Sequence, residues 1–314
     1  MNRAAIAAGP ETVVRALTHH RRDVRGSLFT GALFACLLVG MAILATLLYT
    51  VISGSLPAWR DRSLTTFVTS QMSADPHVAG IWQAFYGSLT LMLFTALIAF
   101  PLGISAAVYL EEYAPDTRLT RLINANIRNL AGVPSIVYGL LGLAVFVKLL
   151  GGITGPEVEG RSVIAGGLTL GLLTLPIVII TTAESLRAVP NALREAAYGV
   201  GSTQWQVIRH HILPVGAPGI FTGTILSLGR AFGEAAPLLL VGGITTFFSV
   251  GDASFLEALR GRFSAMPVLV FSWSRLPQEE FRALTAALIV VMLVVLLLVN
   301  GTAIYLRNRF EKGA

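Results

Sequence analysis

The chain has 314 residues, of which 54% are hydrophobic and only 13% are charged, and its formal net charge is +6. Soluble domains carry roughly a quarter charged residues, so this composition excludes an ordinary soluble protein and indicates a surface that faces lipid. The basic residues are scattered in short clusters between apolar runs, which argues against a nucleic-acid-binding face. The single cysteine, Cys36, lies inside an apolar run and excludes a disulfide framework or a cysteine-based metal site.

Six apolar stretches are long enough to cross a bilayer as helices, which takes roughly 20 residues. The first follows a group of arginines, but it is too long for the apolar core of a signal peptide and no A-x-A site follows it, so we expect an uncleaved span. The pattern predicts an all-α polytopic membrane protein with an N-terminal tail over 1–28, a membrane domain over 29–306 and a C-terminal tail over 307–314. The six spans are expected at 29–52, 82–110, 127–150, 163–182, 218–244 and 283–306.

Six spans place both termini on the same side of the membrane. If that side is the cytoplasm, arginine and lysine favour the inner segments by about two to one, in agreement with the positive-inside rule. The loop 187–214, between the fourth and fifth spans, is then cytoplasmic. Of the outer segments, 53–81 suits an interfacial helix or loop, and 245–282 suits a re-entrant or interfacial segment with Trp273 at the headgroup level.

The loop 187–214 is polar and helix-forming, which is unusual between two apolar spans. Residues Ala192–Tyr198 are mostly strong helix formers. Gly199 and Gly201 end that helix, and a second helix is expected to begin just after them and to be broken by Pro214 before the fifth span. The loop is therefore predicted to form two short helices that project from the membrane and dock against a soluble partner.

This loop resembles the EAA motif of ABC importer permeases, in which an EAA triplet is followed by a glycine and later by an isoleucine and a Leu-Pro pair. The matching residues are Glu195, Ala196, Ala197, Gly201, Leu213 and Pro214. The sequence departs from the motif at His211, where the family usually has isoleucine. The resemblance implies that the loop docks into a groove of a cytoplasmic ATPase. The residues implied to couple the chain to the ATPase are Arg194, Glu195, Ala196, Ala197 and Gly201.

Two further segments, Asn129–Leu143 and Leu228–Gly243, are similar to the PstA-type permease subunits of bacterial phosphate importers. The resemblance implies a type I, MetI-like ABC permease fold in the bacterial inner membrane, forming one half of a phosphate pore. The partners that it implies are a homologous PstC-like permease, two PstB-like ATPase subunits and a PstS-like binding protein that is periplasmic or lipid-anchored. This chain is then expected to hold no cofactor, with ATP and Mg bound by the ATPase subunits.

Arg230 lies about 18 Å along a helix that begins at Pro218, and an arginine near mid-membrane costs roughly 3 kcal/mol. Glu234 is one turn away, and Ser227 completes the same stripe. In one interpretation the charged pair only fixes helix packing. In another interpretation, which we favour, Arg230 donates hydrogen bonds to a tetrahedral oxyanion. Glu234 then holds the Arg230 side chain when no anion is bound. A gating role is a third interpretation.

A second candidate group lies at the cytoplasmic end of the third span, where Asn126 and Asn129 could line an inner vestibule. Asparagine at a helix entrance is also common as a capping residue, so both interpretations stay open. Ser135 lies one to two turns deeper, beside Pro134, which loosens the helix and favours a rocking motion.

The chain lacks the motifs of an enzyme. Neither Lys148 nor Lys312 follows the glycines of a P-loop, and no Ser/His/Asp or HExxH arrangement occurs. The carboxylate pairs Glu111–Glu112 and Glu279–Glu280 lie at span ends, where solvation explains them. We therefore expect neither a catalytic nor a metal site. The alternatives are an ABC permease for sulfate or molybdate, a phosphate-responsive sensor or scaffold, and a secondary transporter, which would predict inverted repeats.

Overall fold

A computed structural model describes residues 24–243 and 255–311, and every regular element in these two ranges is a helix. The predicted all-α class is therefore confirmed. The chain divides into two compact units after Thr50. Helix α2 (Val24–Asp61) begins in the first unit and ends in the second. None of its most apolar stretch is buried, as expected for a helix that faces lipid.

Five helices in the described ranges are long and apolar enough to cross a membrane, and a bent pair would make a sixth. The five are Arg25–Arg60, Trp82–Tyr113, Val163–Arg187, Gln204–Phe232 and Glu279–Thr302. They overlap five of the spans expected from the sequence. The third expected span corresponds to the bent pair.

Helices α4 (Trp82–Val108), α8 (Val163–Arg187) and α11 (Leu213–Phe232) pack together in the second unit, with α8 against both of the others. Glycines allow this close approach. A β-carbon at Gly103 of α4 would lie 2.6 Å from Cγ1 of Val178 on α8, and one at Gly223 of α11 would lie 2.3 Å from Cβ of Thr181. Small residues at helix contacts are typical of membrane proteins, where packing replaces the hydrophobic effect between helices.

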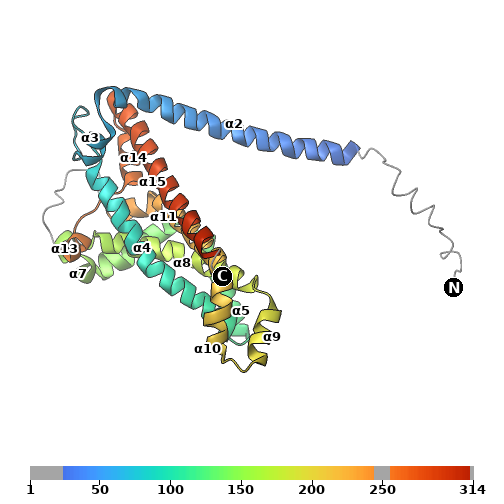
Figure 1. Ribbon diagram of the computed structural model, residues 1–314. Helices are drawn as coiled ribbons and strands as arrows, with labels where there is room; N and C mark the ends of the chain where they lie inside the picture. The colour runs from blue at the N-terminus through green and yellow to red at the C-terminus, as the bar shows by residue number, and fades with distance from the viewer. Residues whose placement is uncertain (1–23, 244–254, 312–314) are drawn as a thin grey trace. The chain divides into compact units, whose positions relative to one another are not determined.

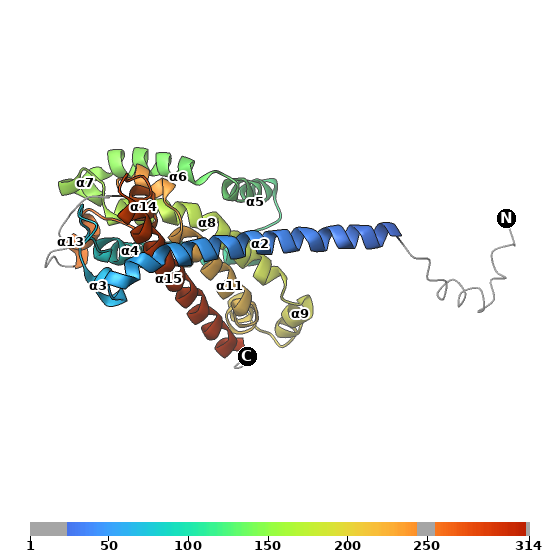
Figure 2. The ribbon, with the colours of Figure 1, turned by 90° about the horizontal axis from the view of Figure 1, so that it is seen from above.

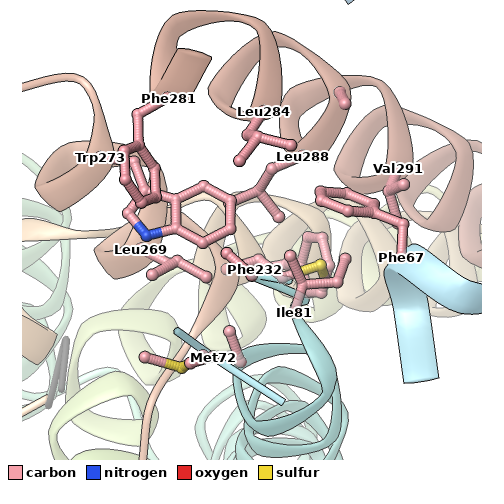
Figure 3. Close-up of a cluster of buried hydrophobic side chains, with 14 residues drawn as sticks. Phe67, Met72, Ile81, Phe232, Leu269, Trp273, Phe281, Leu284, Leu288 and Val291 are labelled. Carbon is pink, nitrogen blue, oxygen red and sulfur yellow. The ribbon is translucent and has the colours of Figure 1, made fainter. Parts of the chain in front are cut away.

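Helices α3 (Leu64–Thr69), α14 (Met266–Trp273) and α15 (Glu279–Glu311) share a buried apolar cluster at one end of the second unit (Figure 3). Trp273 is 3% exposed, and its ring centroid lies 5.4 Å from that of Phe281. Aromatic side chains of α3 and α15 cover Trp273, and its expected position at the headgroup level stays a prediction. Residues 245–254 of the expected re-entrant segment lie outside the described residues.

The helix expected over 127–150 is broken. Helix α5 (Arg118–Ala131) ends before Pro134, and α6 (Ser135–Gly142) leaves it at an angle of 101°. A proline disfavours helical geometry in the residue before it, so the chain turns here. The Tyr138 hydroxyl donates a hydrogen bond of 2.9 Å to the Leu130 carbonyl and holds the bend.

The helix expected over 218–244 is also broken. Helix α11 ends at Phe232, and a five-residue helix, α12 (Ala236–Leu240), follows after Gly233. Helix α12 packs on α6, so the two short helices that follow the two breaks are in contact. A β-carbon at Gly139 of α6 would lie 2.7 Å from the Cα of Pro237, which shows how closely they approach.

The loop between α8 and α11 forms α9 (Asn191–Gly199) and α10 (Gln204–Val207), as expected, at the end of the second unit opposite α3 (Figures 1 and 2). The predicted break at Pro214 was wrong. A π-helical turn over Ile208–Ile212 joins α10 to α11, and its wider backbone accommodates the proline without ending the helix. The remaining elements are α7 (Gly151–Thr154), a 3₁₀ turn (Pro156–Val158), α13 (Phe255–Arg260) and π-helical turns at Tyr109–Tyr113 and Leu143–Leu149.

Candidate functional site

The turn between α9 and α10 has a defined geometry. Gly201 has φ +86°, a left-handed conformation that glycine adopts without a steric penalty. Thr203 caps α10 by accepting a hydrogen bond from the Gln206 backbone N–H, while the Gln206 side chain accepts one from the Thr203 N–H. This reciprocal capping satisfies two donors at the start of the helix. The capping therefore stabilises the turn between the two short helices.

The two alanines of the EAA triplet face different environments. Ala197 is 5% exposed and packs in an apolar cluster that joins the loop to α8 and α11. Ala196 and its neighbour Glu195 are exposed. Of the two alanines expected to couple the chain to an ATPase, only Ala196 is therefore accessible to a partner.

Large apolar side chains are exposed on the same loop. Val200 is 83% exposed, and Tyr198 and Trp205 are about half exposed. Apolar side chains on an otherwise polar projection commonly mark a protein-interaction surface. Together with Glu195 and Ala196, they form what we call the loop surface.

Arg194 points back into the protein, although it was expected to share the docking role. Its guanidinium Nη2 lies 2.9 Å from Oε1 of Glu112, and the two side chains are 19% and 9% exposed. Glu112 belongs to the π-helical turn at the end of α4. Its neighbour Glu111 accepts two hydrogen bonds from Arg187, at the end of α8.

The interpretation of Glu111 and Glu112 as merely solvated was wrong, because both carboxylates pair with arginines across helix ends. A signal in the sequence was available. The two acidic residues and the two arginines flank spans whose ends were expected on the same side of the membrane, so opposite charges were already placed at one level.

Arg230 and Glu234 lie at the break between α11 and α12. The Arg230 Nε is 3.7 Å from Oε1 of Glu234, and the two side chains are 51% and 19% exposed. Arg230 is in the last turn of α11, where a positive charge interacts favourably with the helix dipole. Glu234 follows the end of the helix instead of lying on its next turn. The pair is close enough to interact, and the arginine remains accessible.

Ser227 does not share this exposed surface. It is 1% exposed, and its hydroxyl donates a hydrogen bond of 2.6 Å to the Thr224 carbonyl on its own helix. It therefore lies within the helix packing.

The second group expected from the sequence lies around the bend between α5 and α6. Asn126 is exposed, and its amide donates to the Leu122 carbonyl one turn back. Asn129 is exposed near the end of α5, and Ser135 is partly buried at the start of α6. Helix α6 follows this group in the chain and helix α12 follows Arg230. Because α6 and α12 are in contact, the two regions are linked.

Comparison with known proteins decides the family. Residues 99–312 match the family described as "Binding-protein-dependent transport system inner membrane component". The chain belongs to this family. The match begins within α4 and includes the loop surface, both helix breaks and α15.

The permease has curated relatives across nearly its whole length. It is 33% identical over 289 residues to "Phosphate transport system permease protein PstA 1" of Mycobacterium tuberculosis (strain CDC 1551 / Oshkosh), covering 90% of this chain and 88% of that protein. It is 35% identical over 226 residues to "Probable ABC transporter permease protein YqgI" of Bacillus subtilis (strain 168), covering 72% of this chain and 73% of that one.

The fold of the permease also matches a solved structure of a bacterial alginate ABC transporter in complex with an alginate pentasaccharide-bound periplasmic protein. The TM-score is 0.64 at 16% identity, and the match covers 92% of this chain and 96% of that chain. At this identity the likeness concerns the fold alone, and it supports the expected ABC permease architecture.

Proposed function

We propose that this permease forms one half of the membrane pathway of an ATP-driven importer of inorganic phosphate. The observation that carries the proposal is the extent of the similarity to a phosphate transport permease, which covers 90% of the chain and is not confined to a shared motif. The exposed guanidinium of Arg230 supports it, since a planar fork of donors suits a tetrahedral oxyanion.

The proposed partners are a homologous second permease, a phosphate-binding protein on the outer side and two ATPase subunits in the cytoplasm. The loop surface supports the ATPase contact, because it offers apolar side chains and a carboxylate on a projection stiffened by capping. The sequence contains no P-loop, so ATP and Mg would be bound by the ATPase subunits. Both termini of the chain are proposed to be cytoplasmic.

In the proposed mechanism, ATP binding brings the ATPase subunits together, and the loop surface carries this movement to the spans. The spans of the two permeases then alternate between inward-facing and outward-facing states. Arg230 would compensate the charge of the anion while it passes, because an ion without a partner is costly in a low-dielectric environment. The breaks beside α6 and α12 supply segments that can shift without bending a long helix.

The proposal is tested by uptake of radiolabelled phosphate into proteoliposomes that contain the complete complex, with ATP on the side of the ATPase subunits. We expect ATP-dependent uptake that excess unlabelled phosphate suppresses and that excess sulfate or molybdate does not. If sulfate or molybdate suppressed uptake, the proposed substrate would be wrong but the proposal of an ATP-driven importer would stand. Absence of any ATP dependence would overturn the importer proposal itself.

The proposed role of the loop surface predicts the effect of reversing the charge of Glu195. Glu195→Arg is expected to lower ATP-dependent uptake by about tenfold, since a lost charge-assisted hydrogen bond costs roughly 1.5–3 kcal/mol. Co-purification of the ATPase subunits with the permease measures the same contact directly. Glu157→Arg is the matched control, because Glu157 is an exposed glutamate outside the loop. Equal uptake and equal ATPase recovery in the two variants would contradict the prediction.

A further inference from the structure

The Glu112–Arg194 ion pair connects the end of a membrane span to the helix that carries the loop surface. Glu112 lies in the π-helical turn that ends α4, and Arg194 lies in α9. Both side chains are largely covered, at 9% and 19% exposure. Charges that are partly shielded from water interact more strongly than charges on an open surface.

Arg194 makes further hydrogen bonds that tie α9 to the end of α8. Its Nη2 also donates to the Leu186 carbonyl at 2.9 Å, and its Nη1 donates to the Val189 carbonyl at 2.8 Å. Leu186 is in the last turn of α8 and Val189 lies just beyond its end, so the guanidinium binds the backbone where the chain leaves α8 for α9. One side chain thus joins α4, α8 and α9.

Glu112 is also held by the second helix of the loop. The Gln204 side-chain amide, at the start of α10, donates to the Glu112 backbone carbonyl at 2.5 Å. Both short helices of the loop are therefore bonded to the same residue at the end of α4. The apolar cluster around Ala197 and Ile208 adds packing beneath these bonds.

We propose that the Glu112–Arg194 pair is a positioning device that makes the loop move as one body with α4 and α8. This inference rests on the proposed function, in which an ATPase acts on the loop surface. Arg194 acts inside the permease and does not itself touch the ATPase. A displacement of α9 is transmitted to the two spans through the pair, and weakening the pair lets the loop tilt without moving them.

The neighbouring Glu111–Arg187 pair provides a matched control. Its two hydrogen bonds, of 2.7 and 2.5 Å, are shorter than the 2.9 Å bond between Arg194 and Glu112. It joins the end of α4 to the end of α8, however, and Arg187 is 47% exposed. Removing this pair should therefore leave the attachment of α9 intact, although the chemical change is the same.

The first experiment measures the position of α9 relative to α4. Cys36 is the only cysteine, so spin labels can be placed at Tyr109→Cys and Ala192→Cys in a Cys36→Ser background, in the full-length chain within its assembled complex in lipid nanodiscs. Tyr109 and Ala192 are exposed, and Ala192 lies on α9 outside the loop surface. We expect a narrow distance distribution by pulsed EPR that broadens in Glu112→Gln, broadens less in Arg194→Lys and is unchanged in Glu111→Gln.

The second experiment measures phosphate transported per ATP hydrolysed in proteoliposomes. Glu112→Gln is expected to lower this ratio by about fivefold or more, and Glu111→Gln by less than about twofold, since only the former leaves a covered charge without its partner. The inference would be overturned if Glu112→Gln and Arg194→Lys kept both a narrow EPR distance distribution and an unchanged ratio of phosphate transported to ATP hydrolysed. The EPR distance measurement requires neither substrate nor ATP. It therefore tests whether the pair positions the loop even if the protein proves not to import phosphate.

Discussion

Replacing Arg230 by glutamine is expected to abolish most ATP-dependent phosphate uptake while the complex still assembles. The arginine is the charged donor group at the break between α11 and α12, and its side chain is 51% exposed, so an anion can reach it. Hydrogen bonds to charged groups contribute roughly 1.5–3 kcal/mol each, and a guanidinium can make two to one oxyanion, so a loss of about a hundredfold is reasonable. Initial uptake rates at saturating and limiting phosphate measure the effect.

Two variants separate this role from a purely structural one. Arg230→Lys keeps the charge and loses the planar fork, so it should retain part of the uptake. Arg282→Gln is the control, because Arg282 is also an exposed arginine with a nearby glutamate, Glu279, at 3.9 Å. If Arg230 served only to neutralise Glu234, then Glu234→Gln would rescue Arg230→Gln. Restored uptake in that double variant would contradict the anion-binding role.

Replacing Gly139 by valine is expected to destabilise the permease and to stop transport, because α6 and α12 could no longer pack. A β-carbon at this position would lie 2.7 Å from the Cα of Pro237 and 2.8 Å from Cδ1 of Leu240. Overpacking of this kind typically costs roughly 1–3 kcal/mol, and a backbone atom cannot move aside as a flexible side chain would. Thermal unfolding of the purified complex and phosphate uptake measure the two effects.

The control for Gly139 is another glycine of the same unit. Gly171 lies in α8, and a β-carbon there would meet no atom within 4 Å. Gly171→Ala should therefore leave transport unchanged and raise stability slightly, since alanine favours a helix by about 1 kcal/mol over glycine. If Gly139→Val unfolds at the same temperature as Gly171→Ala, the close contact between α6 and α12 does not govern stability.

The spans that the sequence located well are those without an internal break. The expected ranges 82–110 and 163–182 overlap α4 and α8, because a long apolar run has no other way to satisfy its backbone than as a helix in lipid. Prolines alone did not decide where helices end. Pro101 and Pro176 lie inside α4 and α8, whereas Pro134 lies at a sharp bend.

The sequence also predicted the candidate site only in part. The motif identified the loop and its two short helices, since helix formers, glycines and capping residues act over a few positions. It did not separate Ala196 from Ala197, of which only the first is exposed. It also assigned Arg194 to a partner outside the chain, although the contact is with Glu112, more than eighty residues away along the chain.

The sequence by itself determined the membrane class, the approximate spans and the family resemblance, because these depend on composition, on the length of apolar runs and on local motifs. Only the tertiary structure decided where the third and fifth spans break, which alanine of the loop is covered and which charges pair. These features depend on contacts between helices that are distant in the chain, such as α6 with α12 and α4 with α9. Local propensity contains no information about such contacts, because their energy arises only when the helices meet.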